Sequence, residues 1–331
     1  MMPTKAAISS ITILFLASCM SHVEDAPEVT IYVSADEQVA REVFGAFTRE
    51  TGIEIVWVGD TEASKTTLLV NRLRLERDIP VADVFWSSEI LGMIQLANED
   101  MLSPHRSSRA DVWPSKHRDS SYRWFGFSPR ARVIAYDPAR IQESQLPKSW
   151  WSFGSAAIAD PRFGTTGTHL AVMAAFPDQF PAFVDSLTSK PLLGGNAATL
   201  QAVVDGTATF AMPDTDDVHR AIERGASVAM HYPRHHDGVG GGTLLIPNTV
   251  GIIQGCDHPK LAAAFVDFML SDQVAVLLAH SISHNIPLQP AIAKQFPELV
   301  VHDPLDVDFY AAASVQKEVI LIVMDRLNRE P

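Results

Sequence analysis

Three aspartates within four positions are the side chains of this 331-residue sequence with the clearest capacity for binding chemistry. Asp214, Asp216 and Asp217 follow a predicted strand at 207–212 and stand where a helix is expected to begin. Carboxylate oxygens are the ligands that hard cations prefer. The same acids could instead cap the helix, since negative charge at a helix N-terminus is stabilising without any ligand. Three acids are more than one helix cap needs. The sequence therefore leaves two roles open for them: lining a ligand-binding cleft and capping the helix.

A second segment has the composition of an anion site. Gly164, Thr165, Thr166, Gly167 and Thr168 stand in a row before an apolar helical segment at 170–175. Two glycines and three hydroxyls at a helix start expose backbone N–H groups and the positive end of the helix dipole. The alternative interpretation is a glycine-rich turn closed by a threonine cap.

Arginine and histidine side chains provide two further candidates. Arg130 and Arg132 are two apart on a predicted strand and therefore share one side of it, which is either the cleft or solvent. His235 and His236, with His231 nearby, carry ligand atoms for a transition metal. Because the pair adjoins the glycine run at 238–242, we predict a solvated loop there rather than a metal site.

The elements that must position these residues alternate between strand and helix. Strands are predicted at 29–33, 53–58 and 82–86, with helices at 36–51, 61–77 and 89–98. This alternation indicates an α/β fold with largely parallel sheets covered on both faces. Ligands of such sheets bind beyond the carboxyl ends of the strands, which here are followed by Ser34, Asp36 and Glu89. A second βα series begins after Trp124, and 306–328 is predicted as a helix that docks on the body.

The first nineteen residues are typical of a lipoprotein signal peptide. Lys5 gives a positive start, 6–15 are largely apolar and too short for a membrane span, and Leu16-Ala17-Ser18-Cys19 has the pattern of a lipobox. An ordinary cleaved signal and a first buried helix are the alternatives. Acylation at Cys19 would hold the mature chain on a bacterial membrane. We therefore expect a lipid-anchored protein of the periplasm or cell surface.

Net charge and cysteine content narrow the class of partner. The formal net charge is -13, and no block of lysine and arginine is long enough to suggest a nucleic-acid groove. A small anion would need hydrogen-bond donors directed at it from nearby, because the negative field of the whole molecule repels it.

Cys256 is the one cysteine besides Cys19, so we expect no disulfide in the mature chain. The length is enough for two ordinary domains.

Several segments resemble the periplasmic ferric-iron-binding proteins, or bacterial transferrins, which are solute receptors of ABC importers. The segment at 124–136, WFGFSPRARVIAY, is similar to the stretch of that family that crosses between lobes, and further matches are at 31–38, 46–53, 82–86, 262–271 and 286–288. The resemblance implies the two-lobed, type 2 periplasmic-binding-protein fold, whose crossing strands form a hinge that closes over a ligand. The implied division is a signal peptide at 1–19, a linker at 20–27, lobe 1 at 28–124 and 250–298, lobe 2 at 125–249, and a helical tail at 299–331.

The ligand set is where this sequence departs from that family. Its members hold iron with two adjacent tyrosines, aided by a histidine and a glutamate, whereas this chain has no Tyr-Tyr pair and places 211–217, AMPDTDD, there. Asp36 matches the histidine position, and Glu89 is one residue from the glutamate. The resemblance thus implies a metal set of Asp36, Glu89, Asp214 and Asp216. It also implies an anion or ligand set of Ser34, Arg130, Thr165, Thr166, Gly167, Thr168 and Asn196.

The sequence therefore predicts a monomeric extracytoplasmic receptor, without a cofactor, that serves an ABC permease and its ATPase. A ferric ion with phosphate or carbonate is the first candidate ligand, and a phosphonate-type zwitterion or another small anion is the alternative. A lipid-anchored hydrolase is the alternative of a different class. That hydrolase would need a Ser-His-Asp set assembled in three dimensions, because the sequence has no Gly-x-Ser-x-Gly elbow, P-loop or His-Glu-x-x-His segment.

Overall fold

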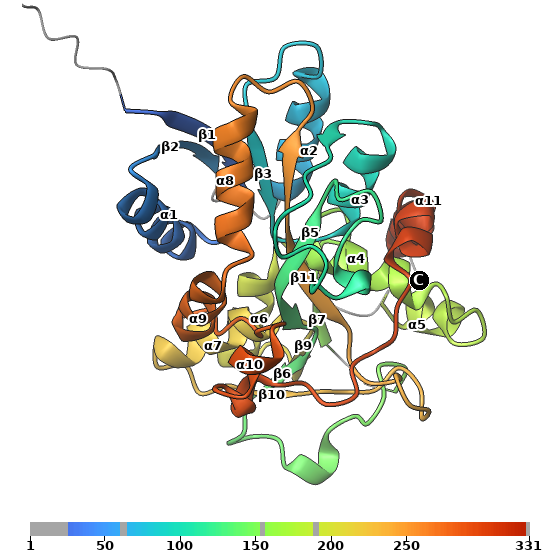
Figure 1. Cartoon of the computed structure of the whole chain (residues 1–331). Coiled ribbons are helices and arrows are strands. Elements are labelled where there is room, and N and C mark those ends of the chain that lie inside the picture. Colours follow the sequence, from blue (N-terminus) through green and yellow to red (C-terminus); the bar gives the residue numbers. More distant parts are fainter. Residues whose placement is uncertain (1–25, 60–64, 153–155, 188–191, 329–331) are drawn as a thin grey trace, which may run out of the picture.

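The computed structural model describes residues 26–59, 65–152, 156–187 and 192–328. Within them the chain forms two α/β lobes, one in the upper and one in the lower half of Figure 1, each built on its own sheet. This arrangement confirms the predicted two-lobed fold class. The predicted signal peptide, its Cys19 and most of the linker lie outside the described residues.

The sheet of the first lobe has the strand order β2-β1-β3-β11-β4, with β5 paired to β11. Its strands are β1 (Glu28–Val33), β2 (Glu54–Gly59), β3 (Val84–Ser87), β4 (Leu102–Ser103), β5 (Phe125–Ala131) and β11 (Leu245–Ile253). Ile31 and Val33 of β1 belong to one apolar cluster and Tyr32 belongs to another. Because successive side chains of a strand face opposite sides, this alternation means that the sheet is covered on both faces.

The sheet of the second lobe has the order β10-β6-β9-β7-β8. Its strands are β6 (Ile134–Tyr136), β7 (Ala156–Ala159), β8 (Leu192–Leu193), β9 (Phe210–Ala211) and β10 (Ala229–His231). Here β7 is parallel to β8 and β9, whereas β6 is antiparallel to β9 and β10. Both sheets are therefore mixed, and the prediction of largely parallel sheets is wrong in this detail. In the first lobe the reason is β11, which returns from the second lobe and enters antiparallel to β3.

The two lobes are joined by β5 and β11, which pair antiparallel through the middle of the molecule (Figure 1). The register of this pair shifts between Ile246 and Asn248. Pro247 stands at the shift and has no N–H to donate, which is the usual setting of a β-bulge. β11 is consequently one strand with a bend.

Helices cover the first sheet on both faces. α1 (Glu37–Thr51) begins at Asp36, whose carboxylate accepts the Gln38 N–H at 3.0 Å, and it ends at Gly52, where φ is 71°. A left-handed residue of this kind is readily supplied by glycine, so the predicted start and stop of α1 are confirmed. The other helices of this lobe are α2 (Lys65–Leu75), α3 (Leu91–Asn98) and α8 (Pro259–Met269).

The second lobe contains α4 (Gly164–Met173), α5 (Phe180–Leu187), α6 (Asn196–Val204) and α7 (Thr215–Glu223). α9 (Asp272–His280) and α10 (Pro290–Ala293) follow α8, and short 3-10 turns occur at η1 (Ser115–His117), η2 (Glu143–Gln145) and η3 (Pro297–Leu299). Leu278 of α9 packs in a first-lobe cluster, whereas Ala275 and Ala279 pack with the second lobe. The segment predicted as the second part of lobe 1, 250–298, thus contacts both lobes.

The C-terminal helix α11 (Phe309–Asn328) docks on the body, as predicted. Phe309 and Ala312 pack with residues of α3, and Val319 and Val323 join a cluster of the second lobe. Gln95 Nε2 of α3 donates a hydrogen bond of 2.8 Å to Gln316 of α11. Among the described helices, none by itself has the length and apolar character to cross a membrane; α8 and α9 meet that criterion only as a pair, which is bent by 60°.

Candidate functional site

A cavity of about 310 Å³ lies between the lobes. On the first-lobe side it is lined by residues that follow strands β1 and β3, including Ser34, Asp36 and Ser88. On the second-lobe side it is lined by the N-terminal ends of α4, α6 and α7. Its position agrees with the expectation that ligands bind where the strands end. The positive ends of several helix dipoles are thus directed at one small space.

The start of α4 supplies uncommitted hydrogen-bond donors to this cavity. The helix begins at Gly164, where φ is 58°, and its N-cap residue Phe163 makes no side-chain capping bond. Thr165 and Thr166 line the cavity. Thr166 is 3% exposed, and its Oγ1 has no hydrogen-bond partner within the described residues. A buried hydroxyl and free backbone N–H groups at a helix start are the chemistry that binds an oxyanion.

Gly167 and Thr168 belong to the same turn but are absent from the described lining of the cavity. A Cβ at Gly167 would lie 2.5 Å from the Pro161 carbonyl oxygen, so this position needs glycine for close packing. Thr168 Oγ1 donates a hydrogen bond to Glu89 at 3.1 Å. The predicted anion segment therefore divides into a cavity half, Thr165 and Thr166, and a packing half.

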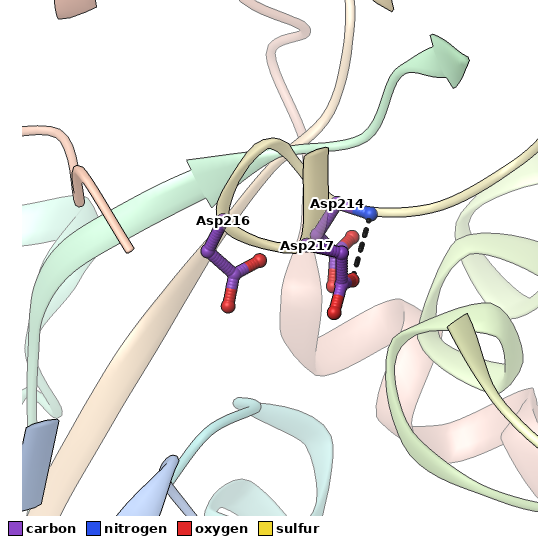
Figure 2. Close-up of side chains that lie close together, drawn as sticks. All are labelled: Asp214, Asp216 and Asp217. Atoms are coloured by element: carbon purple, nitrogen blue, oxygen red, sulfur yellow. Dashed lines mark hydrogen bonds between the residues drawn. The ribbon is translucent and has the colours of Figure 1, made fainter. Parts of the chain in front are cut away.

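The three aspartates open α7 and also face the cavity (Figure 2). Asp214 and Asp217 form a reciprocal capping box, in which the Asp214 N–H donates to Asp217 at 3.2 Å. One carboxylate oxygen from each of Asp214, Asp216 and Asp217 lies within 4.8 Å of the others. The two roles left open by the sequence, helix capping and a place in the cleft, are therefore combined.

Burial and neighbouring charges act differently on two of these acids. Burial alone would raise the pKa of Asp214, but the Arg132 and Arg130 guanidinium groups outweigh it and hold the pKa below its ordinary value. Burial, reinforced by the charge of Asp217, raises the pKa of Asp216 to about 7. Oδ1 of Asp216 accepts no hydrogen bond within the described residues. This oxygen lies 3.5 Å from Arg130 Nε, so its capacity as an acceptor is only partly used.

The two arginines of the crossing strand both reach Asp214, so the prediction that they share one side is confirmed. Arg132 is fully buried, and its Nη1 lies 2.9 Å from Asp214 Oδ1 and donates to Thr165 Oγ1 at 3.1 Å. Arg130 Nε lies 3.5 Å from both Asp214 and Asp216. Arg130 also donates to the backbone carbonyl of Ser88 in the first lobe. The solvated alternative for this pair is wrong, because both side chains are buried in ion pairs.

On the opposite wall, Asp36 and Ser34 are already engaged. Asp36 caps α1 and also accepts a hydrogen bond of 2.5 Å from Arg220 Nη1 of α7, across the cavity. Ser34 Oγ accepts the Ser88 N–H at 2.8 Å. Asn196 Nδ2 donates to Asp217 at 2.8 Å. All three of these predicted residues line the cavity, but each of them has a protein partner.

Glu89 does not line this cavity, although the sequence placed it in the metal set. Its carboxylate oxygens accept the N–H groups of Leu91 and Gly92 at 2.7 and 2.8 Å, which caps the start of α3. Glu89 also accepts the hydrogen bond from Thr168 of α4 in the second lobe, so the carboxylate is fully engaged by protein groups. Burial raises the pKa of Glu89. We therefore leave Glu89 out of the proposed site.

The histidine loop also differs from its prediction. His235 is 2% exposed, so the expected solvated loop is wrong for this residue. Its Nε2 lies 2.9 Å from His169 Nε2, and both rings pack against Trp150. The neighbouring His236 is exposed. Nothing in the local sequence indicates this burial, because the aromatic partners come from distant segments.

Arg220 is the site residue that the sequence analysis missed. Its Nη2 lies 2.7 Å from Asp217 and 3.8 Å from Asp216 on its own helix. The spacing could have revealed these contacts, since Arg220 stands three and four positions after the two aspartates. The contact with Asp36 could not be found in this way, because 184 positions separate the two residues.

Comparisons with known proteins agree with this architecture. The major ferric iron-binding protein of Neisseria meningitidis serogroup A is 25% identical over 308 residues, which cover 87% of this chain and 89% of that protein. Iron-bound HitA from Pseudomonas aeruginosa superposes with a TM-score of 0.75 at 22% identity, covering 90% of this chain and 99% of the other. AfuA from Actinobacillus pleuropneumoniae, with fructose-6-phosphate bound, gives 0.74 at 18% identity, covering 92% and 99%. These two structures establish the shared fold.

The family pattern of bacterial extracellular solute-binding proteins matches residues 32–276. This range includes every strand of both sheets except the beginning of β1, both crossing strands, and the residues that line the cavity up to α9. A match over most of the chain, together with two lobes that enclose a polar cavity, leads to one assignment: the chain belongs to the bacterial extracellular solute-binding proteins.

Proposed function

We propose that this chain is the receptor of an ABC importer and that it presents a small solute to a membrane permease and its ATPase. As a member of a solute-binding family it is a binding protein rather than an enzyme. The cavity between two lobes and the bent crossing strands support a cycle of closing and opening around the solute. We propose that the receptor works as a monomer and without a nucleic-acid partner.

The proposed solute carries an oxyanion group that binds at the start of α4. The observation that carries this proposal is the buried, unpartnered Thr166 hydroxyl at an uncapped helix N-terminus in the cavity wall. Backbone N–H groups of the same turn supply further donors. Thr165 Oγ1 donates a hydrogen bond of 2.7 Å to Asp214 Oδ2, which holds this turn in place. These local donors can hold an anion although the chain as a whole is acidic.

A ferric ion with phosphate or carbonate is the first candidate for the complete ligand. The names of the Neisseria relative and of iron-bound HitA support it. The close oxygens of Asp214, Asp216 and Asp217 are suitable ligands for such a hard cation. Because the tyrosine pair is absent from the sequence, a ferric form would lack phenolate-to-iron charge transfer and would be nearly colourless.

A phosphonate-type zwitterion is the second candidate. It is favoured by the arginines that already neutralise the aspartates. It is also favoured by Oδ1 of Asp216, which accepts no hydrogen bond within the described residues and could accept one from an ammonium group. The likeness to AfuA, whose structure holds fructose-6-phosphate, adds an example of an organic phosphate in this fold.

Titration calorimetry on protein freed of metal by a chelator tests the proposal. The ligands are ferric citrate with phosphate, inorganic phosphate alone and 2-aminoethylphosphonate. Binding of any oxyanion that Thr166→Val weakens supports the cavity as the solute site. Failure of all three ligands to bind would contradict the oxyanion proposal and leave only the membership of the solute-binding family.

We also propose that a lipid on Cys19 holds the receptor on a membrane facing the periplasm or the cell surface. The support is the lipobox at 16–19 and the preceding apolar segment. Cells fed a palmitate analogue should label the wild-type protein and not Cys19→Ser. Wild-type protein that stays unlabelled and free of membranes would contradict the anchor.

A further inference from the structure

The acidic cluster of the cavity is matched by guanidinium groups that belong to the protein itself. Among the carboxylates that line the cavity, four lie in one network of ion pairs with arginines: Asp36 with Arg220, Asp214 with Arg130 and Arg132, Asp216 with Arg130 and Arg220, and Asp217 with Arg220. The side chains of these seven residues are at most 30% exposed, so their charges are poorly screened by water.

Arg220 has a special position within this network. Its guanidinium lies between Asp36 of the first lobe, at 2.5 Å, and Asp217 of the second lobe, at 2.7 Å. A cation bound between the lobes by these carboxylates would have to occupy the same place. The nearby acids raise the pKa of Arg220 further above its already high value despite its burial, so the group stays charged.

A metal ion could use these carboxylates only by displacing the arginines. Removing the partner of a buried charge leaves the remaining charge uncompensated, which is strongly destabilising. An oxyanion at the start of α4 meets no such penalty, because the Thr166 hydroxyl there has no partner within the described residues and no side chain of the N-cap residue caps the helix. The first N–H groups of a helix have no partner within the helix itself. At the other side of the cavity, Oδ1 of Asp216 lies 3.5 Å from Arg130 Nε but accepts no hydrogen bond within the described residues.

We infer that Arg220, assisted by Arg130, is the specificity-determining residue that replaces a bound metal cation in this receptor. The solute is then a small organic phosphate or phosphonate that binds without metal, and it carries a hydroxyl or ammonium group that donates to Asp216. This inference rests on the proposed oxyanion site and decides between its two candidate ligands.

The test compares the wild type with Arg220→Gln and with Arg224→Gln. Arg224 is an exposed residue at the C-terminal end of the same helix and serves as the matched control. Circular dichroism first verifies that all three proteins are folded. Calorimetry then measures 2-aminoethylphosphonate and fructose-6-phosphate in the presence of a chelator, and gallium(III) as a redox-inert analogue of the ferric ion, with phosphate and without a chelator.

We expect the wild type and Arg224→Gln to bind at least one organic phosphorus compound without metal. Arg220→Gln should bind gallium at least tenfold more tightly than the wild type, because it frees Asp36 and Asp217. Wild-type protein that binds gallium with phosphate but no organic compound would overturn the inference while the oxyanion site stands. Equal gallium affinity in all three proteins would also overturn it. The absence of any binding would contradict the oxyanion site as well.

Discussion

At the scale of single residues, the Thr166 hydroxyl gives the most direct test of the oxyanion site. Thr166→Val keeps the branched shape and removes the donor, so the affinity for a phosphate or phosphonate should fall about tenfold, since a hydrogen bond to a charged group contributes roughly 1.5 kcal/mol. Calorimetry measures the change. Thr168→Val is the matched control, because its hydroxyl bonds to Glu89 outside the cavity. Equal losses of affinity in both variants would contradict the site.

The pair of His169 and His235 makes a second prediction at this scale. His235 Nδ1 faces the Gly242 carbonyl oxygen at 2.7 Å and must donate to it, so the Nε2 of His235 accepts from His169. Burial lowers the pKa of His235 to about 4, and burial with the adjacent His235 lowers the pKa of His169 well below its usual value. Both rings are therefore neutral in the folded lobe.

The unfolded chain takes up protons at these histidines below about pH 6.5, whereas the folded chain resists doing so. The contribution of these histidines to the free energy of unfolding is therefore fully present above about pH 6.5 and is lost as the pH falls toward 4. For His235 alone, the loss at pH 5 is about 2 kcal/mol. Thermal unfolding at pH 7.5, 6 and 5 should show this slope. His235→Asn should reduce it, and the exposed control His302→Asn should leave it unchanged. A slope that survives His235→Asn undiminished would contradict the assignment.

At the scale of secondary structure, α11 determines how firmly α4 is supported. Val323 of α11 is fully buried in a second-lobe cluster, whereas its neighbour Ile322 is 47% exposed. We expect Val323→Ala to lower the free energy of unfolding by about 2 kcal/mol, through lost burial and a residual cavity. Ile322→Ala should cost less than about 0.5 kcal/mol. Urea denaturation of both variants gives the comparison, and similar costs would mean that the tail is not docked as described.

The bend at Pro247 belongs to the same scale. The paired crossing strands are continuous on either side of it, so a change in the angle between lobes can be absorbed where the register shifts. Helix α9 contacts both lobes next to this crossing. We therefore expect α9 to support the hinge from the side while the lobes open and close about the cavity.

At the scale of the whole molecule, the contacts across the cavity describe a closed form. Arg220 of α7 ties the second lobe to Asp36 of the first. Arg130 of the crossing strand β5 joins the Ser88 carbonyl of the first lobe to Asp214 and Asp216 of the second. We expect Asp36→Asn to weaken this tie and to shift the free protein toward an open form with a larger radius of gyration. Solution X-ray scattering measures it, with the surface variant Glu37→Gln as control. Identical scattering from both variants and the wild type would show that the tie does not hold the lobes.

Much of the architecture could be predicted from local sequence. The alternation of β-branched strands with amphipathic helices predicted an α/β fold, and the resemblance to the ferric-iron-binding proteins implied its two lobes. The predicted limits of α1, 36–51, agree with the structure within one residue. The same periodicity did not indicate that β11 enters the first sheet antiparallel, because strand direction depends on the path of the chain between lobes. Periodic patterns describe one element at a time.

The sequence by itself determined which groups reach the cavity rim, since Ser34, Asp36, Thr165 and Asp214 each stand at the end of a strand or the start of a helix. Tertiary structure alone decided their partners. Glu89 follows a strand like the others, yet it turns back to cap α3, and His235 is buried although it adjoins a glycine loop. Above all, Arg220 meets Asp36 across 184 positions. A charge's role depends on its neighbours in space, because burial and pairing set its energy, and the folded chain alone brings those neighbours together.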